Sequence, residues 1–376
     1  MLHTSLNNTD KCCGCMACKN VCPTSCISIT SNHIGNFSKK MDIKKCIHCG
    51  RCEKVCPILK PARLQFPGKA YVAWSKKINV NRKSASGGVA ASLYEYCIKN
   101  NIYCIGTRYD KRLKVKYDFI RNIESIRDFV GSKYVYSHMN TIYKKIMLCL
   151  ERGEKVIFIG LPCHVAALQN VVRKDKENLI CIDLVCHGMV AEKFLAEHID
   201  AMIEQTKREY ITSIDFREEK NPYGITLKGK NGEVIKRQSK EQDEYMLGYC
   251  QEFIYCKECY ACQYTRRERC SDLTIKDFCG ETGQGILSKQ RYGLSNILIN
   301  TSKGEQLIEE LKPYLNILDY SVEKVIAEDA RLREPTKKGW KRVFVKLYPL
   351  LGFDLSVRVL CFMTIFKDKI RQKCKV

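Results

Sequence analysis

The residues of this sequence with the clearest capacity for chemistry are its cysteines, 24 among 376 residues. Eight of them form two copies of one spacing: three cysteines two residues apart, then a fourth that directly precedes a proline. The copies are Cys12-x2-Cys15-x2-Cys18-x3-Cys22-Pro23 and Cys46-x2-Cys49-x2-Cys52-x3-Cys56-Pro57. Bacterial ferredoxins use this spacing, in which three thiolates of a run hold one [4Fe–4S] cluster and the fourth binds the other cluster. The sequence therefore predicts a two-cluster electron-transfer module.

Because each run gives three cysteines to one cluster and its fourth to the other, every ligand can be assigned to a cluster. We expect the first cluster to be held by Cys12, Cys15, Cys18 and Cys56, and the second by Cys46, Cys49, Cys52 and Cys22. Zinc sites also use Cys-x2-Cys pairs. Three evenly spaced cysteines with a fourth before proline, used twice, favour iron and sulfide over zinc. Cys13 and Cys26 fall outside the pattern, and we interpret them as bystanders.

The setting of these cysteines also favours metal over disulfides. The first residues lack the basic segment and apolar run of a signal peptide. We therefore expect a cytoplasmic location, where thiols stay reduced and clustered cysteines indicate metal binding.

The formal net charge of +23 is unevenly distributed. From Pro335 onward, 11 Lys and Arg oppose Asp354 and Asp368, so this tail carries 11 − 2 = +9. The remainder shows no basic helix or aromatic–basic ladder, and nucleic-acid binding is not expected. A solvated basic surface is the simplest interpretation; docking of an acidic redox protein, such as a ferredoxin, or of an anionic membrane is the alternative.

Beyond the cysteine-dense segment, strands and helices alternate. Apolar runs predict buried strands over 70–74, 102–105, 156–159 and 179–185, and helical spacing covers 89–98 and 165–172. This alternation is typical of βαβ units, so we expect an α/β body with a mostly parallel sheet behind a ferredoxin-like α+β domain. Residues 211–234 are more β-like, and Asn231-Gly232 predicts a hairpin turn.

Further candidate site residues lie between these elements. Cys163 follows one predicted strand and Cys186 ends the next, at carboxyl ends of parallel strands, where open α/β sheets place ligands. Together with Cys256-x2-Cys259-x2-Cys262 they supply enough thiolates for another cluster. Ser84-Ala85-Ser86-Gly87-Gly88-Val89 joins a strand to a helix, where exposed amides can approach a phosphate, although a plain tight turn explains the same residues.

Several of these motifs occur together in one known family. Ser84–Val89, Gly160-Leu161-Pro162-Cys163, Cys186-His187-Gly188, Cys259-Tyr260-x-Cys262 and Ser271-Asp272-x-Thr274-x-x-Asp277-Phe278 occur in this order. Over roughly residues 1–300 the sequence resembles the coenzyme F420 hydrogenase/dehydrogenase beta-subunit family, preceded by a ferredoxin pair. Two positions depart from the family pattern: His164 stands where Gln is usual, and Cys279 where Trp is common. Both departures fall where the family is expected to bind its substrate, so the resemblance does not imply that this chain binds F420.

The resemblance implies an FAD-binding iron–sulfur oxidoreductase. It makes Ser84, Ser86, Gly87 and Gly88 candidate flavin contacts, and Cys163, Cys186, Cys259 and Cys262 candidate ligands of a third [4Fe–4S] cluster. Cys256, Cys270 and Cys279 compete for that ligand set. His187 and Asp277 are candidate proton donors, with a structural role as the alternative. A flavin would connect one-electron clusters to a two-electron carrier or small-molecule substrate.

We expect four segments: a ferredoxin-type domain over 1–62, two parts of a family body over 68–150 and 151–335, and a basic amphipathic tail over 336–376. The tail is interrupted by Pro349, Asp354 and Arg358, so it is too broken to span a bilayer. It could pack on the body or lie on a membrane or partner. The leading function is a reductase or dehydrogenase; the alternatives are an electron-transfer subunit serving a separate catalytic chain, and a redox sensor.

Overall fold

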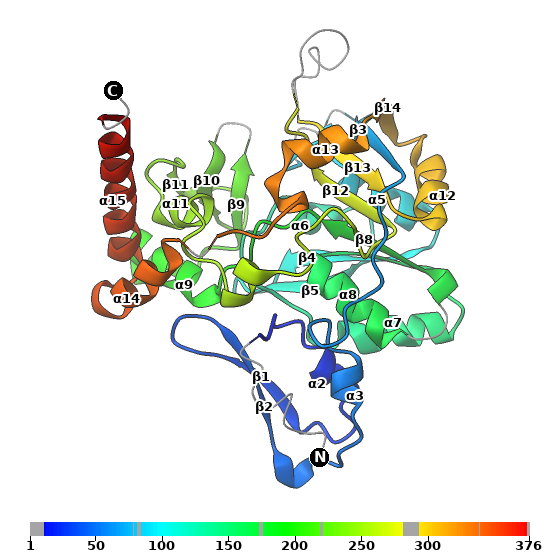
Figure 1. The fold of residues 1–376 in the computed structure, drawn as a ribbon. Coiled ribbons are helices and arrows are strands. Elements are labelled where there is room, and N and C mark those ends of the chain that lie inside the picture. The colour runs from blue at the N-terminus through cyan, green and yellow to red at the C-terminus, as the bar shows by residue number, and fades with distance from the viewer. Residues whose placement is uncertain are drawn as a thin grey trace.

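The protein is described by a computed structural model over residues 11–77, 79–80, 84–172, 176–218, 221–280, 293–337 and 339–373. Figure 1 shows a small N-terminal module beneath a large sheet, with helices on both sheet faces and a C-terminal helix to one side. The first ten residues of the expected 1–62 domain lie outside the described residues.

The N-terminal module contains one hairpin and three short helices. Strands β1 and β2 pair antiparallel from Ile27↔Met41 to Ser31↔Phe37. Each cysteine run leads into one short α-helix. The elements are α2 (Ala17–Val21), β1 (Ile27–Ser31), β2 (Phe37–Met41), the 3-10 helix η1 (Ile43–Lys45) and α3 (Arg51–Lys54).

The body is built on a nine-stranded sheet with the order β14-β3-β13-β12-β8-β7-β4-β5-β6. The expected strands 70–74, 102–105, 156–159 and 179–185 are found as β3, β4, β7 and β8. The nine strands are β3 (Lys69–Ser75), β4 (Tyr103–Tyr109), β5 (Val115–Ile120), β6 (Ser137–His138), β7 (Val156–Gly160), β8 (Leu179–Leu184), β12 (Leu273–Asp277), β13 (Ser295–Ile299) and β14 (Leu315–Tyr320).

The sheet is mixed, with a parallel centre and antiparallel pairs on both flanks. Strands β12, β8, β7 and β4 form a central parallel block. On one side β13 and β14 pair antiparallel with their neighbours, and on the other β5 pairs antiparallel with β4. The α/β class is thus confirmed, while the predicted parallel direction holds only for the centre. Because β13 lies antiparallel between β12 and β3, β3 points the same way as the central block.

Helices cover both faces of the sheet because successive side chains of a strand point to opposite sides. In β7, Val156 and Phe158 face α7 (Ile142–Glu151) and α8 (Pro162–Val171). Ile157 and Ile159 face α5 (Val89–Lys99) and α12 (Ser302–Leu311). The remaining short elements around the sheet are α6 (Ile126–Phe129), η2 (Lys176–Asn178), α13 (Val322–Glu328) and η5 (Ala330–Leu332).

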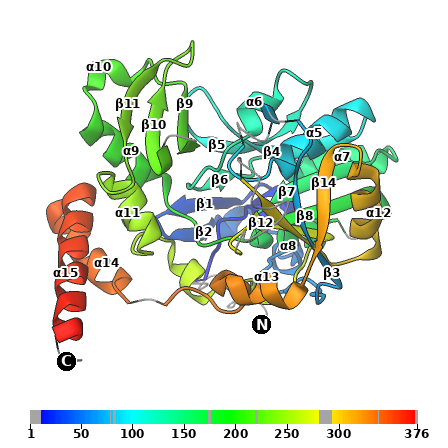
Figure 2. The same ribbon diagram turned by 90° about the horizontal axis from the view of Figure 1, so that it is seen from above.

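A second, three-stranded antiparallel sheet carries the β-like region, with the order β11-β10-β9. The expected turn joins β10 to β11, with Gly232 at φ 79°. Figure 2 shows this sheet beside the large one. Its elements and neighbours are β9 (Ser213–Glu218), β10 (Asn221–Lys228), β11 (Val234–Gln238), α9 (Glu192–Met202), α10 (Gln205–Arg208), α11 (Glu244–Cys250) and η3 (Lys257–Ala261).

The tail forms two helices that pack on the protein itself. Helix α14 spans Lys341–Leu351 and α15 spans Phe353–Lys373. Phe344, Phe353, Val357 and Leu360 are buried in the core made by α9, α11 and the small sheet. Packing on the body is therefore the correct alternative for this part of the tail. No helix among the described residues combines the length and apolar character needed to cross a membrane.

The expected boundary at residue 150 does not separate two cores. Segment 68–150 supplies β3 to β6 and segment 151–335 supplies β7, β8 and β12 to β14, all in one sheet. The two segments therefore form one continuous body, and residues at its carboxyl edge come from both.

Candidate iron–sulfur and flavin site

The two predicted ligand sets lie around two separate hollows of the N-terminal module. One hollow is lined by Cys12, Cys15, Cys18 and Cys56, the set expected for the first cluster. The other is lined by Cys22, Cys46, Cys49 and Cys52, the set expected for the second. Cys13 also lines the first hollow and Cys26 the second. The thiols are thus grouped as the interlocked spacing requires.

Both cysteine runs turn by the same backbone device. The residue before the middle cysteine has a positive φ, 70° at Gly14 and 54° at His48. The residue after it does too, 61° at Met16 and 67° at Gly50. These left-handed residues bend the chain so that consecutive thiols face one centre. Left-handed backbone is unfavourable for Met and His, so its repetition indicates a shared structural demand.

Backbone amides point at the thiols of the first hollow. Cys12 accepts a hydrogen bond from the Gly14 amide and Cys15 from the Ala17 amide. Burial is the larger effect and raises the pKa of the Cys12 thiol, while the amide lowers it. Amide donors favour the charged form of sulfur, which is the form that binds iron. The donor set therefore fits a [4Fe–4S] cluster.

The module is docked on the body by its first-cluster side. Cys13, Cys15 and Ala17 share a hydrophobic core with α7 and α8. Tyr136 Oη donates to the Gly14 carbonyl at 2.6 Å. Further bonds join Asn20 Nδ2 to Asn140 O (2.7 Å), Lys193 Nζ to His33 O (2.8 Å), Lys257 N to Asn36 Oδ1 (3.0 Å) and Tyr264 Oη to Pro57 O (2.7 Å).

The expected body thiols gather at the carboxyl edge of the parallel strands. Cys163 stands in the first turn of α8, directly after β7, and Cys186 follows β8, which is parallel to β7. Cys259 and Cys262 come from η3 and its end. The Cys186 thiol accepts from the Gly188 amide, and Met189 N donates to Cys259 Sγ at 3.3 Å. These amide bonds repeat the pattern of the module.

Electrostatic contacts tie the four body thiols into one group. Cys163 interacts with Cys186 and Cys262, and Cys259 interacts with the same two. The competing cysteines point elsewhere. Cys256 Sγ contacts Gly35 O (3.7 Å), Cys270 Sγ contacts Pro162 O (3.4 Å) and the exposed Cys279 contacts Asp277 O (3.6 Å). Of these three, Cys270 still interacts with Cys262 and Cys256 with Cys259.

Cys13 links the module to the body group, which the sequence did not indicate. Its side chain hydrogen-bonds to Cys15 within the module and to Cys163 in the body. It is thus more than a bystander, although its position next to Cys12 gave no spacing signal. The Cys26 sulfur contacts a residue of its own module, Cys22, whose Sγ lies 3.4 Å away.

His164 lies fully buried beside this junction. The Leu161 amide donates to Tyr117 Oη at 3.3 Å, and Tyr117 Oη lies 2.9 Å from His164 Nδ1. When Tyr117 Oη donates its hydrogen to Nδ1, the neutral ring carries its own hydrogen on Nε2. That nitrogen is buried and has no hydrogen-bond partner in the structure. Burial lowers the pKa of His164 to about 4, so the ring is neutral.

Lys341 of the tail brings a buried positive charge toward the body thiols. Its ammonium is buried without a hydrogen-bond partner and interacts with Cys256, Cys259 and Glu258. Burial lowers its pKa to about 8. The ammonium also lies over the rings of Phe194 and Phe344. A buried ammonium without a hydrogen bond is unfavourable, so a further negatively charged group near Cys259 would fit this site.

The expected flavin loop lies at the same edge, between β3 and α5. Ser84 Oγ donates to Val80 O at 2.7 Å and Ser86 Oγ donates to Leu294 O, so both hydroxyl hydrogens are used by the chain. Gly87 N donates to Ser295 Oγ at 3.0 Å, and a side chain at Gly87 would collide with Ala73 O. Gly88 precedes α5 at φ 78° without a side-chain cap. The helix amides, rather than the serines, are left to fit a phosphate.

The two candidate proton donors differ in their surroundings. His187 is exposed at the carboxyl edge. Asp277, at the end of β12, accepts from Arg217 Nη1 at 2.6 Å, and Arg217 also donates to Tyr134 Oη. The structure therefore favours the structural alternative for Asp277.

The Ser-Asp-x-Thr motif serves the sheet. Asp272 accepts from the Cys181 amide at 2.8 Å and from Thr301 Oγ1 at 2.7 Å. Thr274 accepts from Asn300 Nδ2 at 3.0 Å. These bonds join β12 to β8 and to the end of β13. They hold in place the edge that carries Cys186.

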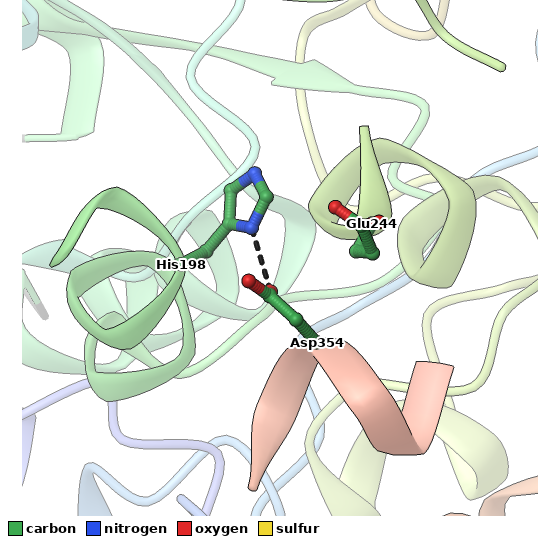
Figure 3. Close-up of side chains that lie close together, drawn as sticks. All are labelled: His198, Glu244 and Asp354. Atoms are coloured by element: carbon green, nitrogen blue, oxygen red, sulfur yellow. Dashed lines mark hydrogen bonds and ion pairs between the residues drawn. The ribbon is translucent and has the colours of Figure 1, made fainter. Parts of the chain in front are cut away.

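A separate group, His198, Glu244 and Asp354, has ligand atoms within 4.8 Å of one another (Figure 3). His198 Nδ1 bonds to Asp354 at 2.7 Å, and Nε2 bonds to Asp243 at 2.9 Å. Glu244 accepts from Arg358 at 2.5 Å. Both ring nitrogens are thus occupied, and the group is a salt-bridge network that joins α9, α11 and α15 rather than a metal site.

Comparisons with known protein families agree with this architecture. Residues 153–320 match the family described as the C terminus of the coenzyme F420 hydrogenase/dehydrogenase beta subunit. Residues 11–58 and 42–102 match two families described as 4Fe-4S dicluster domains. A chain in a solved structure of the F420-reducing [NiFe] hydrogenase complex from Methanosarcina barkeri is similar, with 16% identity and a TM-score of 0.49 over 68% of this chain and 83% of that chain. No curated protein sequence matches.

The cysteine hollows and the dicluster matches define an iron–sulfur protein with [4Fe–4S] clusters. Over residues 153–320 the body is similar to the C-terminal part of the coenzyme F420 hydrogenase/dehydrogenase beta subunit, so the chain is a beta-subunit-like iron–sulfur protein. The family match places the chain broadly among the oxidoreductases.

Proposed function

We propose that the chain is an iron–sulfur flavoprotein oxidoreductase that exchanges electrons with a two-electron carrier or small substrate, coenzyme F420 being one candidate. The first two clusters would be held by the two module sets, and a third by Cys163, Cys186, Cys259 and Cys262. The observation that carries the proposal is the grouping of these four thiols at the carboxyl edge, with Cys163 hydrogen-bonded to Cys13.

The order of the residues suggests a route. The module's second hollow lies at its outer end, the first faces the body, and Cys13 leads from there to Cys163. FAD would be held with its phosphates at the uncapped start of α5, and when bound it would couple single electrons to electron pairs. The chain's own part is to hold the thiolates with amide donors and to keep the junction buried.

The cofactor content tests the proposal. Protein purified without oxygen should hold about 12 iron atoms, as many sulfides and one flavin per chain, since each cubane contains four of each. Cys186→Ser should lower iron to about 8 per chain. Cys279→Ser is the matched control, because Cys279 is exposed and outside the group. About 8 iron atoms and no flavin in the wild type would refute the third cluster and the FAD.

The flavin site has its own test. Ala90→Asp places a negative charge in the first turn of α5, where it stabilises the helix but repels a phosphate. Flavin content should fall while iron content stays constant, and the control Ala90→Gln should keep its flavin. Unchanged flavin in the Asp variant would place the cofactor elsewhere.

Substrate turnover separates an enzyme from a subunit. With an artificial one-electron donor and no partner protein, the proposed enzyme should reduce its carrier. A protein that binds all of its cofactors but reduces substrate only after a second chain is added would be the electron-transfer subunit of the alternative hypothesis.

A further inference from the structure

The outer end of the N-terminal module combines an exposed apolar pair with an iron–sulfur site. Ile43 and Ile47 are 63% and 62% exposed. Ile43 opens η1, just before Cys46, and Ile47 directly follows Cys46. Ile47 lines the second hollow, and Cys49 in the same loop is exposed. Single exposed isoleucines are ordinary, but this pair flanks a cluster ligand.

Positive charge surrounds the pair. Residues 40–54 contain five cations and two anions, which gives 5 − 2 = +3. Asp42 is partly neutralised by Lys45, whose Nζ lies 3.5 Å from its carboxylate. The cations, all on exposed residues, are Lys40, Lys44, Lys45, Arg51 and Lys54.

This surface faces away from the body. The hydrogen bonds that dock the module involve Gly14, Asn20, His33, Asn36 and Pro57, all outside 43–52. Residues that line the first hollow belong to a hydrophobic core shared with α7 and α8. The residues that line the second hollow do not belong to that core. The second cluster site is therefore the end of the route that an outside protein can reach.

We propose that the surface formed by Ile43, Ile47, Lys44, Lys45 and Arg51 docks an acidic one-electron carrier protein, which exchanges electrons with the second cluster. The inference rests on the electron-transfer role proposed above and names its partner. A net charge of +3 attracts acidic proteins and repels basic ones. Two isoleucines suit a small, transient protein contact, because they offer too little apolar area to hold a permanent one.

Stopped-flow reduction without oxygen tests this surface. The probe is a reduced, acidic plant-type [2Fe–2S] ferredoxin, and the readout is bleaching of the protein's cluster absorbance at several salt concentrations. The wild type should react fastest at low salt and slow as salt screens the charges. Lys44→Glu/Lys45→Glu should react roughly tenfold more slowly at low salt, with the difference closing at high salt. Ile43→Ser should slow the reaction at every salt concentration.

The control variant carries the same charge change elsewhere. Arg342→Glu/Lys346→Glu alters two exposed cations on α14, and it should react like the wild type. Iron content and reduction by dithionite should be equal in all variants, which shows that the clusters are intact. The proposal is overturned if the wild type shows no salt-dependent reduction, if the Lys variant matches it, or if the α14 control loses as much.

This test does not depend on the body. Bleaching of the module clusters requires neither a third cluster nor flavin. A protein that lacks both would refute the function proposed above while still giving the expected docking result, so the two failures can be told apart.

Discussion

The Cys13 side chain of the N-terminal module hydrogen-bonds to Cys163 of the body. Cys13 also contacts Cys15, an expected ligand of the first cluster, and Cys163 is a proposed ligand of the third. The two thiols thus connect the first cluster site to the proposed third cluster site through one hydrogen bond. Electron passage across this junction should therefore depend on the Cys13 side chain.

Replacing Cys13 should slow electron passage without removing clusters. Cys13→Val should keep the wild-type iron content, because Cys13 belongs to neither ligand set, but reduction of the body after reduction of the module should slow severalfold. Freeze-quench electron paramagnetic resonance follows this step. Cys26→Val is the control, since Cys26 contacts a ligand but no body residue. Equal rates in the two variants would argue against a role for Cys13.

Removing the Lys341 charge should lower the reduction potential of the third cluster. A nearby cation stabilises the more negative reduced state, and the Lys341 ammonium is buried near Cys259. Lys341→Met keeps most of the side-chain volume and should leave the two module clusters unchanged. Potentiometric titration followed by electron paramagnetic resonance measures each potential. Lys346→Met, an exposed position on the same helix, is the control; three unchanged potentials would refute the prediction.

The packing of the tail should weaken at alkaline pH. Burial lowers the pKa of His198, but hydrogen bonds to Asp243 and Asp354 outweigh it and raise the pKa to about 9. Since this value exceeds the unfolded value of about 6.5, the contribution to stability is complete below about 6.5 and lost as pH rises through about 9. Two to three pKa units correspond to on the order of 3 kcal/mol.

Hydrogen exchange of α15 measured between pH 6 and pH 10, corrected for the intrinsic rate, reports this loss. Protection should fall as pH passes about 9. Asp354→Asn removes one carboxylate partner and should move the fall to lower pH. The same profile in wild type and variant would show that His198 does not hold the tail.

Truncation after Pro335 should destabilise the body but spare the module. It removes Phe344, Phe353, Val357 and Leu360 from the core, and each buried apolar side chain contributes roughly 1.5–3 kcal/mol. The module ligands at 12–56 lie outside that core, so their iron should remain. Thermal unfolding and iron analysis measure both effects, and a chain shortened only by residues 374–376 is the control. Loss of all iron would mean that the module depends on the tail.

Sequence reasoning succeeded where the signal was local. The cysteines grouped by their spacing line the two hollows, and the apolar runs located β3, β4, β7 and β8, of which the last two directly precede Cys163 and Cys186. It missed the antiparallel flank because β12 and β13 are short and contain polar residues such as Lys276, Ser295 and Asn296. These side chains are buried by tertiary contacts that no local pattern shows.

The contacts around the proposed third cluster site could not be predicted from the sequence for the same reason. Cys13 and Cys163 are distant in the chain, as are Lys341 and Cys259, and neither pair has a spacing signal. Ser84 and Ser86 are candidate flavin contacts on the strength of the resemblance alone, and their hydroxyls donate to Val80 and Leu294. Which way a serine points depends on the loop it closes, which the sequence does not reveal.

Gly35, in the turn between β1 and β2, lies so close to Ala191 that any side chain there would collide with it, and its φ is 76°. Together with the bonds at His33 and Asn36, this contact clamps the hairpin to the body. With these contacts in place, the module stays docked on the body and does not move between partners. We therefore expect electron transfer from the module to the proposed body cluster to be indifferent to solvent viscosity, whereas the arrival of an outside carrier should depend on it.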